Sequence, residues 1–100
     1  MQAEHFEEVN GFSNIFTGWG GEDDDLYNRL EEKGLTIIRF DPSVASYVMM
    51  PHYHAVPSPN RWDHLAESLV QFRQDGISTV EYTLEDYELK PLYTHYIVIL

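Results

Sequence analysis

Residues 18–25 (GWGGEDDD) place three glycines around a tryptophan and follow them with four consecutive carboxylates. Glycine adopts positive φ angles at low cost, so this stretch favours a turn over a regular helix or strand. Carboxylates in the first turn of a helix satisfy free backbone N–H groups and complement the helix dipole. We therefore expect an irregular glycine-rich loop that ends where a helix begins, at Asp23.

The composition of the whole chain is also acidic. The 100 residues include 17 Asp and Glu against 6 Lys and Arg, which gives a formal net charge of −11, and 43% of the residues are hydrophobic. Phosphate backbones and anionic lipid surfaces attract basic proteins, so the charge argues against nucleic acid and against direct membrane contact. The absence of cysteine excludes disulfides and thiolate metal sites. Length and composition predict one small acidic globular domain.

Hydrophobic periodicity predicts a mixed α/β chain. The expected helices are residues 2–9, 23–33 and 61–75, and the expected strands are residues 35–40, 44–49, 77–84 and 92–100. The third helix would turn an apolar face, which includes Trp62, Leu65, Leu69 and Phe72, toward the core. Residues 12–21 and the proline-rich residues 51–60 should be irregular, and residues 85–90 should form a charged turn. The last four residues, IVIL, should be buried.

Residues 18–25 allow two interpretations. The flat face of Trp19 suits stacking on a sugar ring, and four adjacent carboxylates repel one another, which makes the least solvated one a better proton acceptor. Alternatively, the glycines form a turn, Trp19 belongs to the core and the acids only cap a helix. Composition and spacing leave both interpretations open.

A family resemblance bears on this choice. Residues 10–30 (NGFSNIFTGWGGEDDDLYNRL) resemble the signature of the β-1,4-galactosyltransferase family, including its N-acetylgalactosaminyl-transferring relatives. The resemblance continues in the family's order through Met-x-x-His at residues 49–52, PNRWD at 59–63, QDGISTVEY at 74–82 and PLYTHYIVIL at 91–100. It implies that residues 1–100 form the C-terminal half of a GT-A type fold, with a mixed sheet and flanking helices.

The resemblance implies an activity and a location. Family members are inverting transferases of the Golgi lumen, and the full-length proteins are type II membrane proteins. They move galactose, or N-acetylgalactosamine, from a UDP-sugar to the 4-hydroxyl of a terminal N-acetylglucosamine or glucose on a glycan, and they use Mn²⁺. The expected partners are therefore UDP-galactose or UDP-N-acetylgalactosamine and a glycan acceptor.

The resemblance also assigns roles to residues. An inverting transfer needs a base for the acceptor hydroxyl, and Asp23 matches that base. The residues that match substrate-contacting positions are Trp19, Gly21, Glu22, Asp24, Arg61, Trp62 and Leu65. Asp25 is expected to cap the helix. Trp62 and Leu65 would fit equally well on the core face of an amphipathic helix, and this alternative stays open.

Met49 and His52 match the family's C-terminal metal ligands. Imidazole is a common ligand, whereas a thioether is unusual on Mn²⁺, which prefers oxygen. The neighbouring Met50 and His54 leave the register of the pair open. In the alternative interpretation, Met49 belongs to a strand core and His52 is an ordinary loop histidine.

The sequence departs from the family pattern in two ways. Residues 53–58 (YHAVPS) are shorter and less charged than the family's mobile loop at this place, which bears on acceptor specificity. The N-terminal donor-binding half of the catalytic domain, with its Asp-x-Asp metal motif, has no counterpart in these 100 residues. We therefore expect the isolated chain to be inactive. The alternative function is a non-catalytic carbohydrate-binding or regulatory remnant of such an enzyme.

Overall fold

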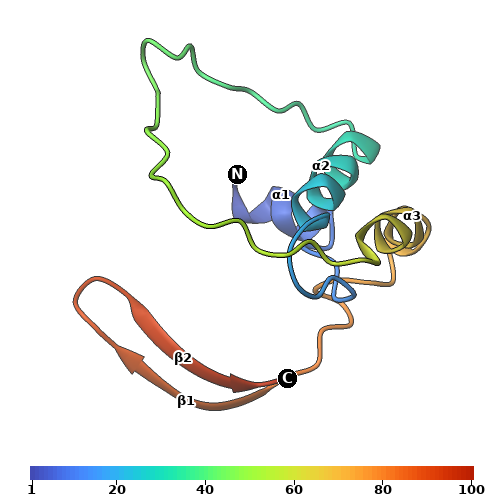
Figure 1. The fold of residues 1–100 in the computed structure, drawn as a ribbon. Coiled ribbons are helices and arrows are strands. Elements are labelled where there is room, and N and C mark those ends of the chain that lie inside the picture. The colour runs from blue at the N-terminus through green and yellow to red at the C-terminus, as the bar shows by residue number, and fades with distance from the viewer.

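Three helices form the most compact part of the molecule. In the computed structural model, which describes residues 1–100, they are α1 (Ala3–Glu8), α2 (Glu22–Glu32) and α3 (Arg61–Gln71). The chain leaves α2, follows a wide arc and returns to the start of α3 (Figure 1). The strands β1 (Thr83–Leu89) and β2 (Thr94–Ile99) form a hairpin that extends away from the helices (Figure 1). The fold is therefore a mixture of helices and strands, as predicted.

A buried arginine joins the three helical segments. Arg29 of α2 is 1% exposed, and its Nε donates to Oδ2 of Asp25 at 2.8 Å. Its Nη1 donates to the carbonyl oxygens of Asp75 at 2.8 Å and Gly11 at 3.3 Å. Its Nη2 donates to Oγ of Ser68 at 2.9 Å and to Oδ2 of Asp75 at 3.3 Å. The guanidinium group thus bonds the end of α1, α3 and the turn after α3, and two carboxylates neutralise its charge.

Asn10 and Asn14 bind the loop that follows α3. Asn10 has a φ of 60°, and its carbonyl oxygen accepts the N–H of Ile77 at 2.9 Å. The side chain of Asn10 accepts the N–H of Ser78 at 2.9 Å, and the side chain of Asn14 donates to the carbonyl of Gly76 at 3.0 Å. A Cβ at Gly76 would lie 1.9 Å from the carbonyl oxygen of Asn10, so only glycine fits there. The NGFSN and QDGIST segments are therefore packed against each other.

The three predicted helices are confirmed, with small changes at their ends. The predicted helix over residues 61–75 ends at Gln71 and continues as turns, in which the N–H of Asp75 donates to the carbonyl of Gln71 at 3.0 Å. Its predicted apolar face is only partly buried: Phe72 is buried, whereas Trp62 is 60% exposed and Leu69 is 49% exposed. The face toward α2 instead presents the small polar Ser68, because that side chain must fit beside the guanidinium group of Arg29.

Two predicted strands are absent from the structure. Residues 35–40 and 44–49 form no strand, and their apolar side chains are exposed, as Ile38 (79%) and Val48 (94%) illustrate. A strand forms only where a second backbone edge pairs with it. No other segment of the described chain pairs its backbone with these residues. The β-branched pattern was therefore not sufficient to form strands here.

The C-terminal hairpin differs from its prediction in its first strand. The predicted strand 77–84 begins only at Thr83, because the preceding loop is bound to Asn10. Residues 85–89 lie in β1 instead of the predicted charged turn. The turn forms farther on, where the N–H of Lys90 donates to the carbonyl of Tyr93 at 2.9 Å. The predicted final strand is confirmed by β2, which pairs antiparallel with β1.

The prediction that the last four residues are buried is wrong. Ile97 is 44% exposed and Leu100 is 95% exposed. A two-stranded hairpin has no second layer to cover its faces, so its side chains remain accessible. The longest helices, α2 and α3, have 11 residues each, and no helix in the structure has the length and apolar character needed to cross a membrane.

Candidate functional site

A pocket of about 280 Å³ lies between the start of α2 and the start of α3. Its lining residues are Trp19, Gly20, Gly21, Glu22, Asp23, Asp24, Arg61 and Trp62. The structure therefore brings together two segments that are about forty residues apart in the sequence. Every residue predicted for catalysis or substrate binding lines this pocket except Leu65, which is half-buried one turn farther along α3.

The glycines shape the entry into α2. Gly20 and Gly21 both have φ values of 102°, which residues with a side chain rarely adopt. Gly21 is the N-cap of α2, and a Cβ there would lie 2.8 Å from the ring of Phe16. The chain can therefore turn sharply between Phe16 and the helix, and this turn places the acidic first turn of α2 in the pocket.

A backbone contact holds Trp19 beside the residues that precede α3. The carbonyl oxygen of Trp19 accepts the N–H of Ser58 at 2.9 Å, and Trp19 forms a parallel bridge with Pro57. Arg61 donates from Nη1 to the carbonyl of Ser58 at 3.2 Å. The side chain of Trp19 remains 49% exposed. The indole is thus fixed through its backbone and accessible through its ring.

The four carboxylates of α2 have different surroundings. Glu22 turns back, and its Oε2 accepts the N–H of Gly20 at 3.1 Å. Asp23 and Asp24 are exposed, and Oδ1 of Asp23 accepts the N–H of Asp24 at 3.1 Å. Asp25 is fully buried and bonded to Arg29, so the prediction that Asp25 caps the helix is wrong. The first three carboxylates face the pocket, and the fourth stabilises the core.

Arg61 and Trp62 form the opposite wall of the pocket. The guanidinium carbon of Arg61 lies 4.8 Å from the centre of the Trp62 ring, within the range of a cation–π contact. Because Trp62 is exposed, the alternative that it belongs to the core is wrong. The pocket therefore combines two accessible indoles with three carboxylates and one cation. Indole faces stack on the C–H face of a sugar, and carboxylates accept hydrogen bonds from its hydroxyls.

Met49 and His52 lie on the long loop, and neither lines this pocket. Met49 is 81% exposed and belongs to no strand, so the interpretation of Met49 as strand core is wrong. The ring of His52 lies 5.2 Å from that of His54, measured between centroids. The structure holds no group of three or more His, Asp or Glu side chains able to bind a metal. Imidazole is a common metal ligand, whereas a thioether is an unusual one for Mn²⁺, which prefers oxygen.

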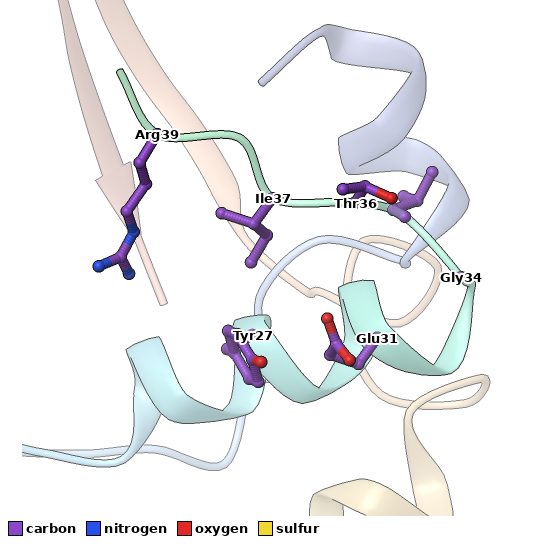
Figure 2. A pocket seen from close by; sticks show the side chains of 7 residues that line it. Tyr27, Glu31, Gly34, Thr36, Ile37 and Arg39 are labelled. Carbon is purple, nitrogen blue, oxygen red and sulfur yellow. The ribbon is translucent and has the colours of Figure 1, made fainter. Parts of the chain in front are cut away.

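A larger pocket of about 450 Å³ lies where the chain leaves α2. Figure 2 shows Tyr27 and Glu31 on α2 below the segment that carries Ile37 and Arg39, with Ile37 pointing toward the helix. This pocket contains none of the predicted site residues. It is a space left beneath the predicted strand 35–40, which has no partner here.

Comparison with known proteins shows the family. A family model described as the N-terminal domain of galactosyltransferase matches residues 1–53. Mouse β-1,4-galactosyltransferase 1 is 38% identical over 97 residues, which cover 94% of this chain and 24% of that protein. This chain belongs to the β-1,4-galactosyltransferase family. The family resemblance read from the sequence is thereby confirmed.

Other family members match to a similar extent. Human β-1,4-galactosyltransferase 2 is 36% identical over 98 residues, which are 95% of this chain and 26% of that protein. Bovine β-1,4-galactosyltransferase 3 is 38% identical over 98 residues, which are 95% of this chain and 25% of that protein. The chain therefore spans about a quarter of the length of the curated relatives it matches.

Sequence reasoning missed the residues that hold the β-1,4-galactosyltransferase-like pocket in place. Arg29 and Asp75 received no role, although their contacts fix α2 relative to the end of α3. The sequence did contain one indication of these contacts. NGFSN and QDGIST are rich in Asn, Asp, Ser and Gly, and they carry part of the family resemblance. Polar segments of this kind serve as partners for buried backbone groups, which is the use the structure makes of them.

Proposed function

We propose that this chain is the acceptor-binding portion of an inverting β-1,4-galactosyltransferase. In this proposal, galactose or N-acetylgalactosamine moves from a UDP-sugar to the 4-hydroxyl of a terminal N-acetylglucosamine or glucose. The observation that carries the proposal is the pocket in which Trp19 and Trp62 flank Asp23. Family membership supports it. Residues 1–100 would form the C-terminal half of a GT-A fold in an enzyme of the Golgi lumen, and the donor would bind to a part of the enzyme outside these residues.

Asp23 is proposed as the base. Inversion proceeds by one in-line displacement, so a carboxylate must accept the proton of the acceptor hydroxyl as the new glycosidic bond forms. Oδ1 of Asp23 is held by the N–H of Asp24, and this contact orients the carboxylate at the pocket. The proton passes from the sugar hydroxyl to Asp23 while UDP leaves with the bonding electrons. In an enzyme form that transfers sugar, Asp23→Asn should abolish transfer and preserve UDP affinity.

The remaining pocket residues are proposed to bind the acceptor. Glu22 and Asp24 would accept hydrogen bonds from sugar hydroxyls, and Gly21 would let the backbone approach the sugar closely. Trp19 and Trp62 would stack on its apolar faces. Arg61, Trp62 and Leu65 would together contact the N-acetyl group, as the family resemblance implies.

Met49 and His52 are proposed as metal ligands of the loop by resemblance to the family. Mn²⁺ would supply charge stabilisation for the leaving diphosphate in such enzymes. Two donors leave most of the coordination sphere of the metal to other groups, so no step of the proposed transfer is assigned to it.

Acceptor binding tests the proposal directly. The 100-residue chain, labelled with ¹⁵N, is titrated with N-acetylglucosamine and followed by NMR. We expect saturable shifts of the Trp19 indole and of the Gly20 and Gly21 amides. Trp19→Ala should abolish them, because it removes the stacking surface. Tyr53→Ala, which alters an exposed aromatic residue of the loop, should leave them unchanged. Shifts that are absent, or equally strong in Trp19→Ala, would contradict an acceptor site here.

The alternative function is a non-catalytic sugar-binding or regulatory protein. The observation that favours it is that the acceptor pocket is formed by these 100 residues alone. A transfer assay with radiolabelled UDP-galactose separates the two functions. The isolated chain should bind N-acetylglucosamine without transferring to it, because it has no proposed site for uridine. Transfer by the isolated chain would contradict the proposed division between donor-binding and acceptor-binding parts.

A further inference from the structure

Asn10 is followed by a glycine, whereas the three other asparagines of the chain are followed by the bulkier residues Ile15, Arg29 and Arg61. The side chain of an asparagine can be attacked by the backbone nitrogen of the next residue, which closes a five-membered succinimide ring. Glycine has no Cβ to hinder this attack. Residues 10–11 are therefore the asparagine dipeptide of this chain that is most reactive toward deamidation.

Deamidation at this dipeptide would proceed in two steps. In the first, the nitrogen of Gly11 loses its proton to solvent and forms a bond to Cγ of Asn10, while the bond from Cγ to the side-chain nitrogen breaks and ammonia leaves. In the second, water opens the ring at one of its two carbonyl groups. The product is aspartate or isoaspartate at position 10, so a neutral amide becomes a carboxylate that only accepts hydrogen bonds.

The folded chain holds both reacting groups in hydrogen bonds. Nδ2 of Asn10 donates to the carbonyl of Phe72 at 3.1 Å and to Oγ of Ser78 at 3.0 Å. Oδ1 of Asn10 accepts the N–H of Ser78 at 2.9 Å. The N–H of Gly11, which is a buried residue, donates to the carbonyl of Phe6 at 2.8 Å. Because the attack needs a deprotonated nitrogen and a side chain free to turn toward it, these bonds oppose the reaction.

We infer that residues 10–11 form a deamidation site that the fold keeps closed and that becomes reactive when residues 76–79 separate from Asn10. Deamidation is slow compared with local opening and closing, so its rate follows the fraction of open molecules. After the reaction, a carboxylate oxygen would face the carbonyl of Phe72 in place of the donor Nδ2, and two acceptors form no hydrogen bond. A reversible opening is thereby converted into a permanent one.

This inference does not rest on the proposed transferase function, because neither Asn10 nor Gly11 lines the sugar pocket. Failure of acceptor binding and failure of the deamidation test are therefore separate outcomes.

Peptide mapping by mass spectrometry tests the site. The full 100-residue chain is kept at mildly alkaline pH, in buffer and in denaturing urea, and conversion to the carboxylate is measured at each asparagine. In urea, Asn10 should convert faster than Asn14, Asn28 and Asn60. In buffer, Asn10 should convert more slowly than in urea by about tenfold or more, because only the open molecules react. Equal rates for Asn10 in buffer and in urea, or equal rates for all four asparagines in urea, would overturn the inference.

Two pairs of variants show whether residues 76–79 close the site. Ser78→Ala removes one acceptor of Nδ2 and should speed conversion in buffer by about two- to tenfold, the worth of one hydrogen bond. Ser46→Ala, in the long loop, is its control and should convert like the parent chain. Gly76→Ala places a Cβ 1.9 Å from the carbonyl oxygen of Asn10 and should speed conversion more than Gly34→Ala, which also has a positive φ. Equal rates within both pairs would show that this contact does not protect Asn10.

Asn10→Asp reproduces one product of the reaction and tests its consequence. This variant should lower the Tm, because a carboxylate oxygen replaces the donor that faces the carbonyl of Phe72. Asn60→Asp is the matched control. Asn60 is the exposed N-cap of α3 and makes no side-chain cap hydrogen bond, and aspartate is as favourable as asparagine at an N-cap, so the Tm should not fall. An unchanged Tm in Asn10→Asp would contradict the permanent opening.

Discussion

The helical part of the chain and the long loop between α2 and α3 are ordered by different kinds of contact. In the helical part, Arg29 bonds Ser68 and Asp75, which are 39 and 46 residues away along the chain. In the loop, the side-chain contacts are local: Asp41 bonds Ser43, and His52 bonds the carbonyl of Tyr53. Long-range polar bonds therefore join the helices, whereas the side-chain bonds within the loop are short-range.

The proposed sugar pocket depends on the first kind of contact. The sugar pocket needs α2 and α3 side by side, so it depends on contacts between distant residues. A substitution in the helical network should therefore affect both stability and sugar binding. A substitution in the loop away from the pocket should change neither. The predictions that follow test this separation.

The largest effect is expected from Arg29→Met. This substitution keeps much of the side-chain volume but leaves Asp25 and Asp75 buried without their cation. Breaking a buried ion pair from one side costs about 3–5 kcal/mol, a large share of the roughly 5–15 kcal/mol that stabilises a domain. Urea unfolding followed by circular dichroism measures the loss. Arg39→Met, at an exposed loop arginine, is the control and should change the unfolding free energy by less than about 0.5 kcal/mol.

An unchanged midpoint of urea unfolding in Arg29→Met would mean that the guanidinium network does not stabilise the helical part. The N-acetylglucosamine shifts provide a second readout. Because Arg29 fixes α2 relative to α3, these shifts should weaken in Arg29→Met and persist in Arg39→Met. Retained shifts in both variants would show that the pocket does not depend on the network.

A smaller effect is expected from Gly76→Ala, with Gly34→Ala as its matched control. Both glycines have positive φ values, 150° and 68°, so both substitutions strain the backbone. At Gly34 nothing lies within 4 Å of the new Cβ, and the strain alone should cost about 1–2 kcal/mol. At Gly76 the Cβ would lie 1.9 Å from the carbonyl oxygen of Asn10, so the bond from Ile77 to that oxygen must also break.

Thermal unfolding of the two variants measures the difference. Gly76→Ala should lower the Tm more than Gly34→Ala, because a lost contact between distant segments is added to the strain of a positive φ. Equal shifts would show that the packing of Asn10 on this loop contributes nothing, and the helical part would then resemble the long loop in lacking long-range stabilisation at this point.

The distinction between local and long-range contacts explains which features the sequence could predict. The helices were predictable because their signals are local: acids at the start of α2, Gly34 after its end, and apolar spacing in α3. The pocket residues Trp19, Asp23 and Trp62 were identified by family resemblance, and the fold places them around one pocket. The Arg29 network was not predictable, because nothing near Arg29 in the sequence indicates a partner 46 residues away.

Two of the strand predictions failed for a related physical reason. A strand is defined by its pairing with another backbone edge, which its own sequence does not contain. Residues 35–40 have a β-type pattern but no partner in this structure, whereas β2 has the same pattern and is paired with β1. The hairpin turn likewise lies where the pairing of β1 with β2 ends, at Leu89 and Thr94, and not at the charged residues 85–89.

The smallest effect concerns the local order of the loop itself. The pKa of Asp41 is held below its ordinary value, first by the hydroxyl of Ser43 and then by the N–H of Ser43, both of which donate to its carboxylate. A carboxyl whose pKa is lowered on folding stabilises the fold above its unfolded pKa, and this contribution is lost as the pH falls through the folded pKa. Asp41 is exposed, so the effect on unfolding should be slight. Ser43→Ala should raise the pKa of Asp41, as measured by an NMR titration of its side-chain carbonyl carbon, and Ser46→Ala should not.

The Asp41 titration also tests whether the loop is ordered independently of the helical part. The turn at residues 41–45 is closed by its own bonds, since the N–H groups of Val44 and Ala45 donate to the carbonyl of Asp41 at 2.9 and 3.0 Å. None of these bonds involves a helix. The lowered pKa of Asp41 should therefore persist in the Arg29→Met chain even as its sugar-binding shifts weaken. A pKa that returns to its ordinary value in that chain would show that the helical network also orders the loop, because only a contact transmitted from the helices could then be holding Ser43 against the carboxylate.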